Sequence, residues 1–282
     1  MKHTKILYTI IAALVLLPFI VSAESTSQTF DASDYDRVEV ETLHGDISAV
    51  AVSGDEISIS FEHSLGAGVE NEITEALSGL LEIAKTYEGS EDVDINITED
   101  KVNRVLKVSV ETIEEGNEEI EDIDISVSLP ASIFVKLTST NGNLSVDGSQ
   151  AGFDLTTTNG NVAIDNTAGP GAFDATNGNV EIDNHAGDLD GKANNGKITG
   201  EIAMPDHNGE CILETVNSDI EVSVPVSVGA TVSLSNVHGA SQITGLDVKT
   251  KKEGDKTIKY TGDGSGRIYL VTVNGDLILK GM

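Results

Sequence analysis

Four acidic residues recur at a fixed interval in the middle of the chain, and they are its best candidates for chemistry. Asp147, Asp165, Asp183 and Glu201 follow one another every 18 residues. If each interval is one coil of a stack, the four carboxylates form a column in which like charges repel. Such a column either splays into solvent or holds a hard cation such as Ca²⁺, which prefers carboxylate oxygens. The Gly-Gly-x-Gly-x-Asp repeat that binds Ca²⁺ is absent, so we favour the solvated column.

The remaining reactive side chains form no catalytic or cofactor-binding signature. The six histidines are scattered, and His44 and His238 stand where other repeats have asparagine, which indicates a structural role. The single cysteine, Cys211, falls among inward apolar positions and is expected to be a buried thiol instead of a nucleophile. Gly262–Gly266 is rich in glycine, but strands flank it instead of a helix N-terminus, so it predicts no phosphate cradle. We therefore expect no catalytic residue, no cofactor site and no metal site.

A repeat built on Asn-Gly pairs must position all of these side chains. The pairs that recur every 18 residues are Asn141-Gly142, Asn159-Gly160, Asn177-Gly178 and Asn195-Gly196. Looser copies carry the pattern outward at His44-Gly45, Asn217-Ser218, His238-Gly239 and Asn274-Gly275. On both arms of each pair, apolar residues alternate with Thr, Ser, Asp, Glu or Lys. This alternation of period two predicts short, half-buried strands.

Two all-β architectures satisfy the pattern. Because Asn-Gly favours a type I′ turn, each unit could be a β-hairpin in a meander. Alternatively, each unit is one coil of a parallel β-solenoid, in which equivalent residues stack about 4.8 Å apart. Only the solenoid explains the return of identical residues, because stacked asparagines can satisfy their amides from coil to coil. We predict one solenoid with coils of about 18–22 residues. Its predicted core includes Leu155, Val162, Ile164, Phe173, Val180 and Ile182.

Two segments fall outside the repeat. Residues 1–23 combine a basic start, an apolar stretch from Ile6 to Val21 and a small-residue cleavage site ending at Ala23. This combination is typical of a secretory signal peptide, and its removal would leave residues 24–282 as a single solenoid domain. Within that domain, apolar residues at helical spacing predict a short inserted helix at residues 69–87.

The excess of acidic over basic residues limits which molecules the protein can bind. With 47 acidic and 17 basic residues, the formal net charge is −30, which repels nucleic acid and anionic lipid. The sequence has no second long apolar stretch, so we expect no insertion into a membrane. Lys249 to Lys259 is the only basic cluster, and it separates the last two repeats. We expect it to be a surface loop, and the alternative is a local contact site for an acidic ligand.

With these columns in view, the chain resembles the "putative adhesin" family of exported bacterial and archaeal β-solenoid proteins. The residues that carry the resemblance are Val38–Ile47, Val127–Pro130, the Thr-x-Asn-Gly coils and Gly264–Ile278. The resemblance spans nearly the whole mature chain, with residues 69–87 looking like an insertion. It implies a β-solenoid and supplies no catalytic residues to carry over.

Three classes of function follow. The first is a non-enzymatic envelope or surface protein whose long β face contacts a polymer, another protein or other cells. The second is a carbohydrate-active enzyme, because parallel β-helices also host lyases and hydrolases. Three arginines and no tryptophan speak against it, since such enzymes need a groove with paired acids and often basic or aromatic partners. The third is a periplasmic accessory to envelope-stress signalling. We expect the first, located in the periplasm or at the cell surface.

Export gives the first testable expectation. Signal peptidase should cut after Ala23, so mass spectrometry of exported material should find Glu24 as the first residue. An intact N-terminus on the exported protein would contradict this.

Overall fold

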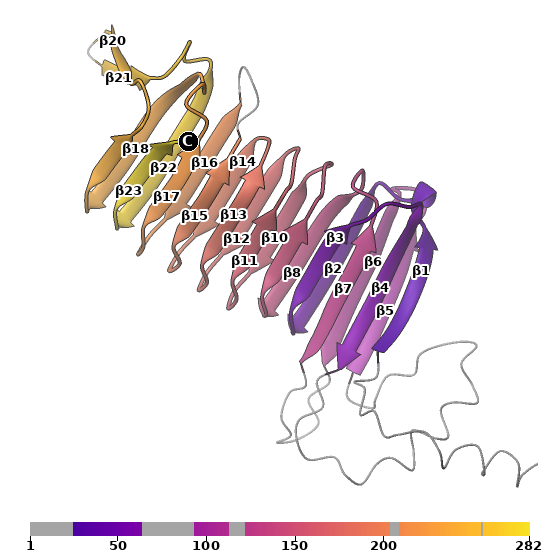
Figure 1. Cartoon of the computed structure of the whole chain (residues 1–282). Helices are drawn as coiled ribbons and strands as arrows, with labels where there is room; N and C mark the ends of the chain where they lie inside the picture. Colours follow the sequence, from indigo (N-terminus) through magenta and orange to yellow (C-terminus); the bar gives the residue numbers. More distant parts are fainter. Residues whose placement is uncertain (1–24, 64–92, 113–121, 204–208, 255) are drawn as a thin grey trace, which may run out of the picture.

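The chain folds into two large β-sheets that face each other and extend along the molecule (Figure 1). The computed structural model describes residues 25–63, 93–112, 122–203, 209–254 and 256–282. One sheet, called sheet A here, has 11 strands, and the other, sheet B, has 12. The predicted signal peptide and the predicted helix at residues 69–87 lie outside the described residues.

The strands of each sheet are given in the order in which they hydrogen-bond. Sheet A consists of β1 (Ser25–Asp31), β4 (Glu56–His63), β7 (Ile123–Leu129), β3 (Ile47–Ala51), β9 (Leu144–Asp147), β11 (Val162–Asp165), β13 (Val180–His185), β15 (Ile198–Ile202), β17 (Ile220–Val224), β23 (Leu277–Gly281) and β19 (Ser241–Thr244). Sheet B consists of β20 (Lys249–Glu253), β21 (Lys256–Tyr260), β18 (Ala230–His238), β22 (Gly266–Asn274), β16 (Glu210–Thr215), β14 (Leu189–Ala193), β12 (Gly171–Ala175), β10 (Phe153–Thr157), β8 (Phe134–Asn141), β2 (Arg37–His44), β6 (Val105–Thr112) and β5 (Val93–Asp100).

Helix is nearly absent from the part of the chain that the structure describes. A 3₁₀ helix, η1 (Ala32–Asp34), precedes β2. No helix in the described ranges has the length and hydropathy needed to cross a membrane.

Successive repeats pair in parallel and contribute one strand to each sheet. Thr157 of β10 pairs with Ser139 of β8 and Ala175 of β12, all in sheet B. The next strand, β11, begins at Val162 and pairs with β9 and β13 in sheet A. The two arms of an Asn-Gly turn therefore lie in different sheets, and the hairpin alternative is wrong. Equivalent residues of neighbouring repeats are direct neighbours instead.

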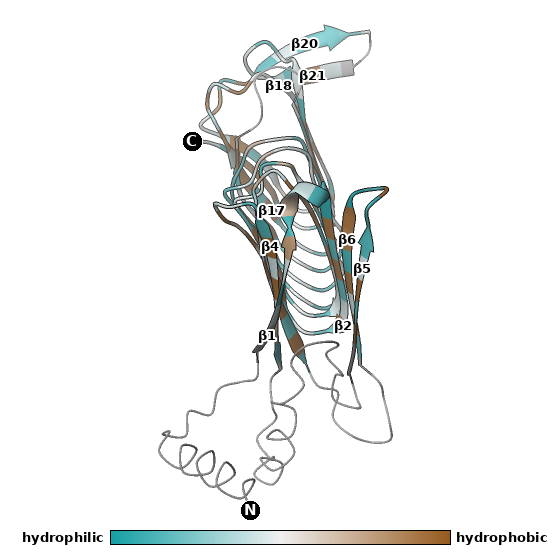
Figure 2. Ribbon diagram, turned by 90° about the vertical axis from the view of Figure 1, so that its right-hand side faces the viewer, coloured by the Kyte–Doolittle hydropathy of each residue, from teal (hydrophilic) through white to brown (hydrophobic). Residues whose placement is uncertain are grey.

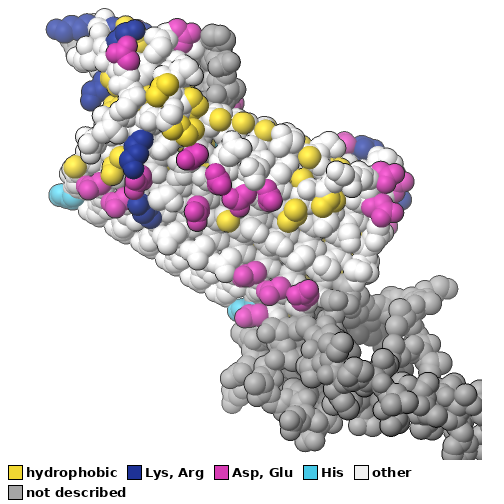
Figure 3. Space-filling model, viewed as in Figure 1, with side chains coloured by type: hydrophobic (Ala, Val, Ile, Leu, Met, Phe, Trp, Pro, Cys, Tyr) yellow, Lys and Arg dark blue, Asp and Glu magenta, His cyan; other side chains and the backbone are white. Residues whose placement is uncertain are grey.

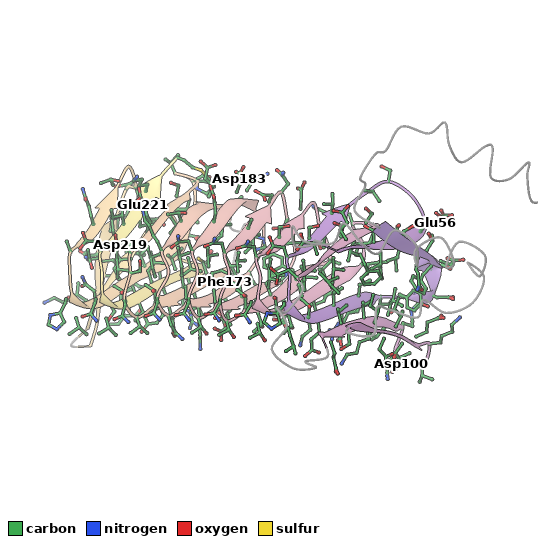
Figure 4. All side chains as sticks on the ribbon, turned by 90° about the horizontal axis from the view of Figure 1, so that it is seen from below. Glu56, Asp100, Phe173, Asp183, Asp219 and Glu221 are labelled. Atoms are coloured by element: carbon green, nitrogen blue, oxygen red, sulfur yellow. The ribbon has the colours of Figure 1, made fainter. Side chains whose placement is uncertain are left out.

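The core is the narrow layer between the two sheets, seen end-on in Figure 2 with β4 and β17 on one side and β2 and β6 on the other. The six residues predicted to point inward are all buried, at 0–3 % exposure: Leu155, Val162, Ile164, Phe173, Val180 and Ile182. Figure 4 shows Phe173 between the sheets.

Two glycines break the apolar columns because large rings fill their places. A Cβ on Gly171 would lie 2.5 Å from Cζ of Phe153, and a Cβ on Gly191 would lie 2.0 Å from Cζ of Phe173. Each ring leans into the neighbouring repeat, which can carry no side chain at that position. This pairing of large and small residues lets a narrow core hold aromatic rings.

The stack does not follow the order of the chain at its two ends. The last strands, β22 and β23, lie between β16–β17 and the earlier pair β18–β19. In the same way, β2–β3 lies between β6–β7 and β8–β9. Antiparallel strands β1, β4 and β5 close one end, and the antiparallel hairpin β20–β21 lies at the other.

The core predicts a large effect for one substitution. Val180→Asp would bury an unpaired carboxylate between the sheets and should lower the free energy of unfolding by on the order of 3–5 kcal/mol. The measurement is urea denaturation followed by circular dichroism. Glu181→Gln changes the exposed neighbour on the same strand and should leave the midpoint nearly unchanged. A Val180→Asp protein as stable as the parent would contradict the assigned core.

Candidate binding surface on sheet A

A groove of about 710 Å³ crosses the outer face of sheet A. It spans residues of β4, β7, β3, β9, β11, β13 and β15, so it runs across the repeats instead of along one strand. Its lining residues come from two rows of outward-facing side chains, one on either side of a row of inward apolar residues.

Four neighbouring side chains of the first row are small, and the surface is hollow there. Ser126, Ser48, Ser145 and Ala163 are direct neighbours across four strands, and Glu181 follows Ala163 on β13. The hydroxyl groups of Ser48 and Ser126 lie 3.2 Å apart, within hydrogen-bond distance. A short polar floor of this kind leaves main-chain and hydroxyl groups accessible to a ligand.

The second row is a ladder in which side chains hold the backbone of the next repeat. The backbone N–H of Asn161 donates to Oδ1 of Asn143, at 2.8 Å, and Asn179 does the same to Asn161, at 2.9 Å. Lys197 continues the ladder by donating its N–H to Asn179. At the other end the N–H of Asn143 donates to Asp46, whose own N–H donates to Oδ1 of Asp124 at 2.9 Å. Sequence analysis missed this row, although its signal is plain: an Asn or Asp directly follows most turn glycines.

The predicted asparagine column is confirmed and is longer than expected. The Nδ2 of Asn159 donates to Oδ1 of Asn141 at 2.8 Å, and the same contact repeats along the stack. The continuing donors are Asn177, Asn195, Asn217 and Asn274, each bonded to the previous asparagine at 2.8–2.9 Å. His44 takes the place of asparagine at one end, with Nδ1 3.3 Å from Nδ2 of Asn141. Its predicted structural role is confirmed.

Buried hydroxyl groups support the same turns from inside. Thr157 donates to the carbonyl oxygen of Gly142, in the preceding repeat, at 3.0 Å. Ser139, Thr215 and Thr272 make the equivalent bond at 2.9–3.2 Å. The turns at Gly45, Gly142, Gly196 and Ser218 thus each accept a hydrogen bond from a buried hydroxyl of a neighbouring repeat, whereas Ala175 and Ala193 occupy this position in two central repeats.

The acidic column lies in register but only in part. Asp165 pairs with Asp147 and Asp183 across neighbouring strands. A register shift between Ile182 and His185 interrupts the column before Glu201. Partial burial, and then the charges of Asp147 and Asp183, raise the pKa of Asp165. Figure 4 shows Asp183 on the outer side of the stack.

A metal centre is not assembled by these residues. Within the described ranges, there is no group of three or more His, Cys, Asp or Glu side chains close enough together to hold a metal ion. The Nδ2 of Asn166 donates a hydrogen bond to Oδ1 of Asp147 at 3.2 Å, so one carboxylate of the column has an amide as its partner.

The side chains of Cys211 and His185 are both buried in the core. Cys211 is 0 % exposed, so the predicted buried thiol is confirmed, and burial raises the pKa of this thiol to about 12. His185, which sequence analysis did not single out, is also buried and lies edge-on to Phe153. Burial lowers the pKa of His185, and Thr167 lies 2.9 Å from its Nδ1. The neutral ring completes a corner of the core.

The basic cluster is a hairpin and not a loop. Lys249–Glu253 and Lys256–Tyr260 form antiparallel strands around a turn in which Gly254 has φ 61°. Figure 3 shows dark-blue side chains gathered at the upper left, where Figure 1 places β20 and β21. The prediction of a loop was wrong because alternation is hard to recognise in a segment where nearly every residue is polar.

Comparisons with known proteins find several solved structures of low sequence identity. No family model matches the chain, and no curated protein matches it. A solved structure described as a "putative cell adhesion protein" from Clostridium sporogenes is 13% identical, with a TM-score of 0.40, over 93% of this chain and 100% of that one. A "putative adhesin" from Bacteroides fragilis is 10% identical, with a TM-score of 0.37, over 93% and 98% of the two chains. A "Putative lipid binding protein" from Parabacteroides distasonis is 11% identical, with a TM-score of 0.32, over 92% and 97%. The first two names agree with the family resemblance seen in the sequence.

The acidic column predicts a pH-dependent gain in stability. Because the pKa of Asp165 is raised above its ordinary value of 3.8, its ionised form destabilises the folded state at neutral pH. Asp165→Asn should therefore raise the melting temperature at pH 7, by an amount equivalent to roughly 0.2–1 kcal/mol. The sign follows from linkage: near and just above pH 3.8 the folded state binds more protons than the unfolded state, so the penalty grows as the pH rises through this range and is fully present at pH 7.

Thermal denaturation at several pH values checks this prediction. The gain of Asp165→Asn should shrink as the pH is lowered from about 7 toward and below the ordinary pKa of 3.8, because both states then become protonated. Asp174→Asn is the matched control, because Asp174 is exposed on sheet B between Thr156 and Lys192. An equal gain for Asp165→Asn at every pH would contradict the electrostatic explanation.

Proposed function

We propose that the protein is an exported, non-enzymatic module of the cell envelope or cell surface that binds an extended partner along sheet A. We further infer that its two sheets form one parallel β-solenoid. The observation that carries both is that the groove is built from equivalent positions of successive repeats. A surface that repeats in this way suits a partner that also repeats, because weak contacts sum along the stack.

The lining of the groove restricts the chemistry of the partner. Asp46, Glu62, Asp124 and Glu181 contribute carboxylates, and Lys197 contributes the single cation. Such a surface repels polyanions and favours a neutral or positively charged chain. None of the lining residues is aromatic, so sugar rings would be held by hydrogen bonds to Ser and Asn instead of by stacking.

A non-enzymatic role is supported by the similarity of the side chains in the groove. Catalysis usually needs a few different groups that converge on one point. Glu221, a partly buried carboxyl whose pKa is lowered to about 2 by hydrogen-bonded ion pairs with Lys280 and Lys197, is not among the residues that line the groove. A carbohydrate-active enzyme and an accessory of envelope-stress signalling remain the alternatives.

Binding to the groove is tested with soluble polymers of different charge. Chitosan oligomers, a neutral glucan and polygalacturonate provide cationic, neutral and anionic probes for the protein of residues 24–282. We expect the neutral or cationic probe to bind and the anionic probe not to bind. Ala163→Lys should fill the groove floor and weaken binding at least about tenfold, or 1.4 kcal/mol. Ala172→Lys, at an equivalent outward position on sheet B, should leave binding unchanged.

A second series separates a repeated surface from an active site. Asn161→Ala, Asn179→Ala and the double variant should weaken binding progressively, with no single change abolishing it. An activity screen against polysaccharides, peptidoglycan and common esters runs alongside. Turnover that disappears on substituting Asp165 or Asp183 alone would replace this proposal with a carbohydrate-active enzyme.

A further inference from the structure

The hairpin β20–β21 projects from the stack with little support from sheet B. Only Thr231 and Val232 of β18 pair with β21, and β20 pairs with β21 alone in the described chain. Figures 1 and 2 both show the hairpin extending beyond the bodies of the two sheets. An element that buries so little of itself adds little to the stability of the fold and is well placed to contact another molecule.

The hairpin concentrates positive charge on a chain whose net charge is −30. Lys249, Lys251, Lys252 and Lys259 are all exposed, and the strand register places them on both faces of the ribbon. Lysines on an edge strand commonly block unwanted pairing between sheets. That role accounts for β20, which is the edge, but not for Lys259, which lies on the inner strand between β20 and β18.

The surface with the opposite charge is the groove of sheet A. Glu62 and Asp124 lie at its β4–β7 end, and Glu181 lies farther along on β13. The hairpin lies at the opposite end of the stack, next to β18. Eight strand spacings separate β19 from β7, which carries Asp124, and nine separate it from β4, which carries Glu62. At about 4.8 Å each, these spacings amount to roughly 38–43 Å. The hairpin also belongs to sheet B, whereas the groove lies on the outer face of sheet A, so the hairpin cannot reach this acidic end of the groove of its own chain.

We propose that the hairpin β20–β21 of one molecule docks in the sheet A groove of a second copy. The inference rests on the proposed binding role of the groove and names the partner. A two-stranded ribbon with lysines on both faces supplies the extended, positively charged segment that the groove favours. Because hairpin and groove are different surfaces, the contact is heterologous and can continue from molecule to molecule.

Sedimentation velocity of residues 24–282 at rising protein concentration tests the docking. Association should be at least about tenfold weaker in 500 mM than in 50 mM NaCl, since salt screens exposed charges. One variant reverses the charge of the hairpin by the substitutions Lys249→Glu, Lys252→Glu and Lys259→Glu. A second variant reverses the charge of the groove by the substitutions Glu62→Lys and Glu181→Lys. Each variant alone should remain monomeric. Glu41→Lys/Asp174→Lys makes the same charge change as the groove variant on exposed positions of sheet B and should associate like the parent.

Mixing the two reversed variants gives the decisive result. The hairpin variant keeps an intact groove and the groove variant keeps an intact hairpin, so an equimolar mixture should form a dimer that cannot grow further. A monomeric parent protein in 50 mM NaCl, or a mixture that stays monomeric, would overturn the proposal. So would a hairpin variant that loses binding to phosphatidylglycerol vesicles while the parent does not self-associate, because the hairpin would then serve a lipid surface.

The same experiments distinguish this inference from the function on which it rests. If Ala163→Lys abolishes polymer binding while the parent stays monomeric, the groove binds a partner but not a second copy. If the parent self-associates and the Ala163→Lys protein does so equally well, the hairpin docks elsewhere and this inference fails.

Discussion

The structure depends on one constraint: parallel pairing places each residue beside its own equivalent in the next repeat. An asparagine suits such a position because its amide both donates and accepts, so Asn141, Asn159 and Asn177 satisfy one another. A carboxylate only accepts, and the same register that satisfies the asparagines sets Asp165 between Asp147 and Asp183. Both columns bring equivalent residues of successive repeats side by side, and the side-chain chemistry decides whether this stabilises or destabilises the fold.

Shape obeys the same constraint as hydrogen bonding. Stacked phenylalanines at one position would overfill a narrow core, so Phe153 and Phe173 are each followed one repeat later by a glycine. On the outer face, stacked serines and alanine have the opposite effect and open a groove. The same strand register thus gives a closely packed core between the sheets and a groove on the outer face of sheet A.

Sequence reasoning recovered what is local and repeated. The alternation predicted the buried residues, the spacing predicted the asparagine ladder, and the inward position of Cys211 predicted its burial. The order of the strands could not be predicted, because each repeat carries the same pattern and nothing local says which repeats are neighbours. The groove was missed for a related reason: its floor joins Ser126 to Ser48, which are far apart in the chain but adjacent in sheet A.

The position of β22 and β23 has a consequence for how the protein is made. The pair β18–β19 reaches β16–β17 only through these last strands, so the stack keeps a gap one repeat wide until they have been synthesised. Early repeats can assemble as they emerge, but this end cannot close, and non-local pairing of this kind is slow. The native pairing at this end therefore forms only after β22 and β23 have joined β18–β19 to β16–β17.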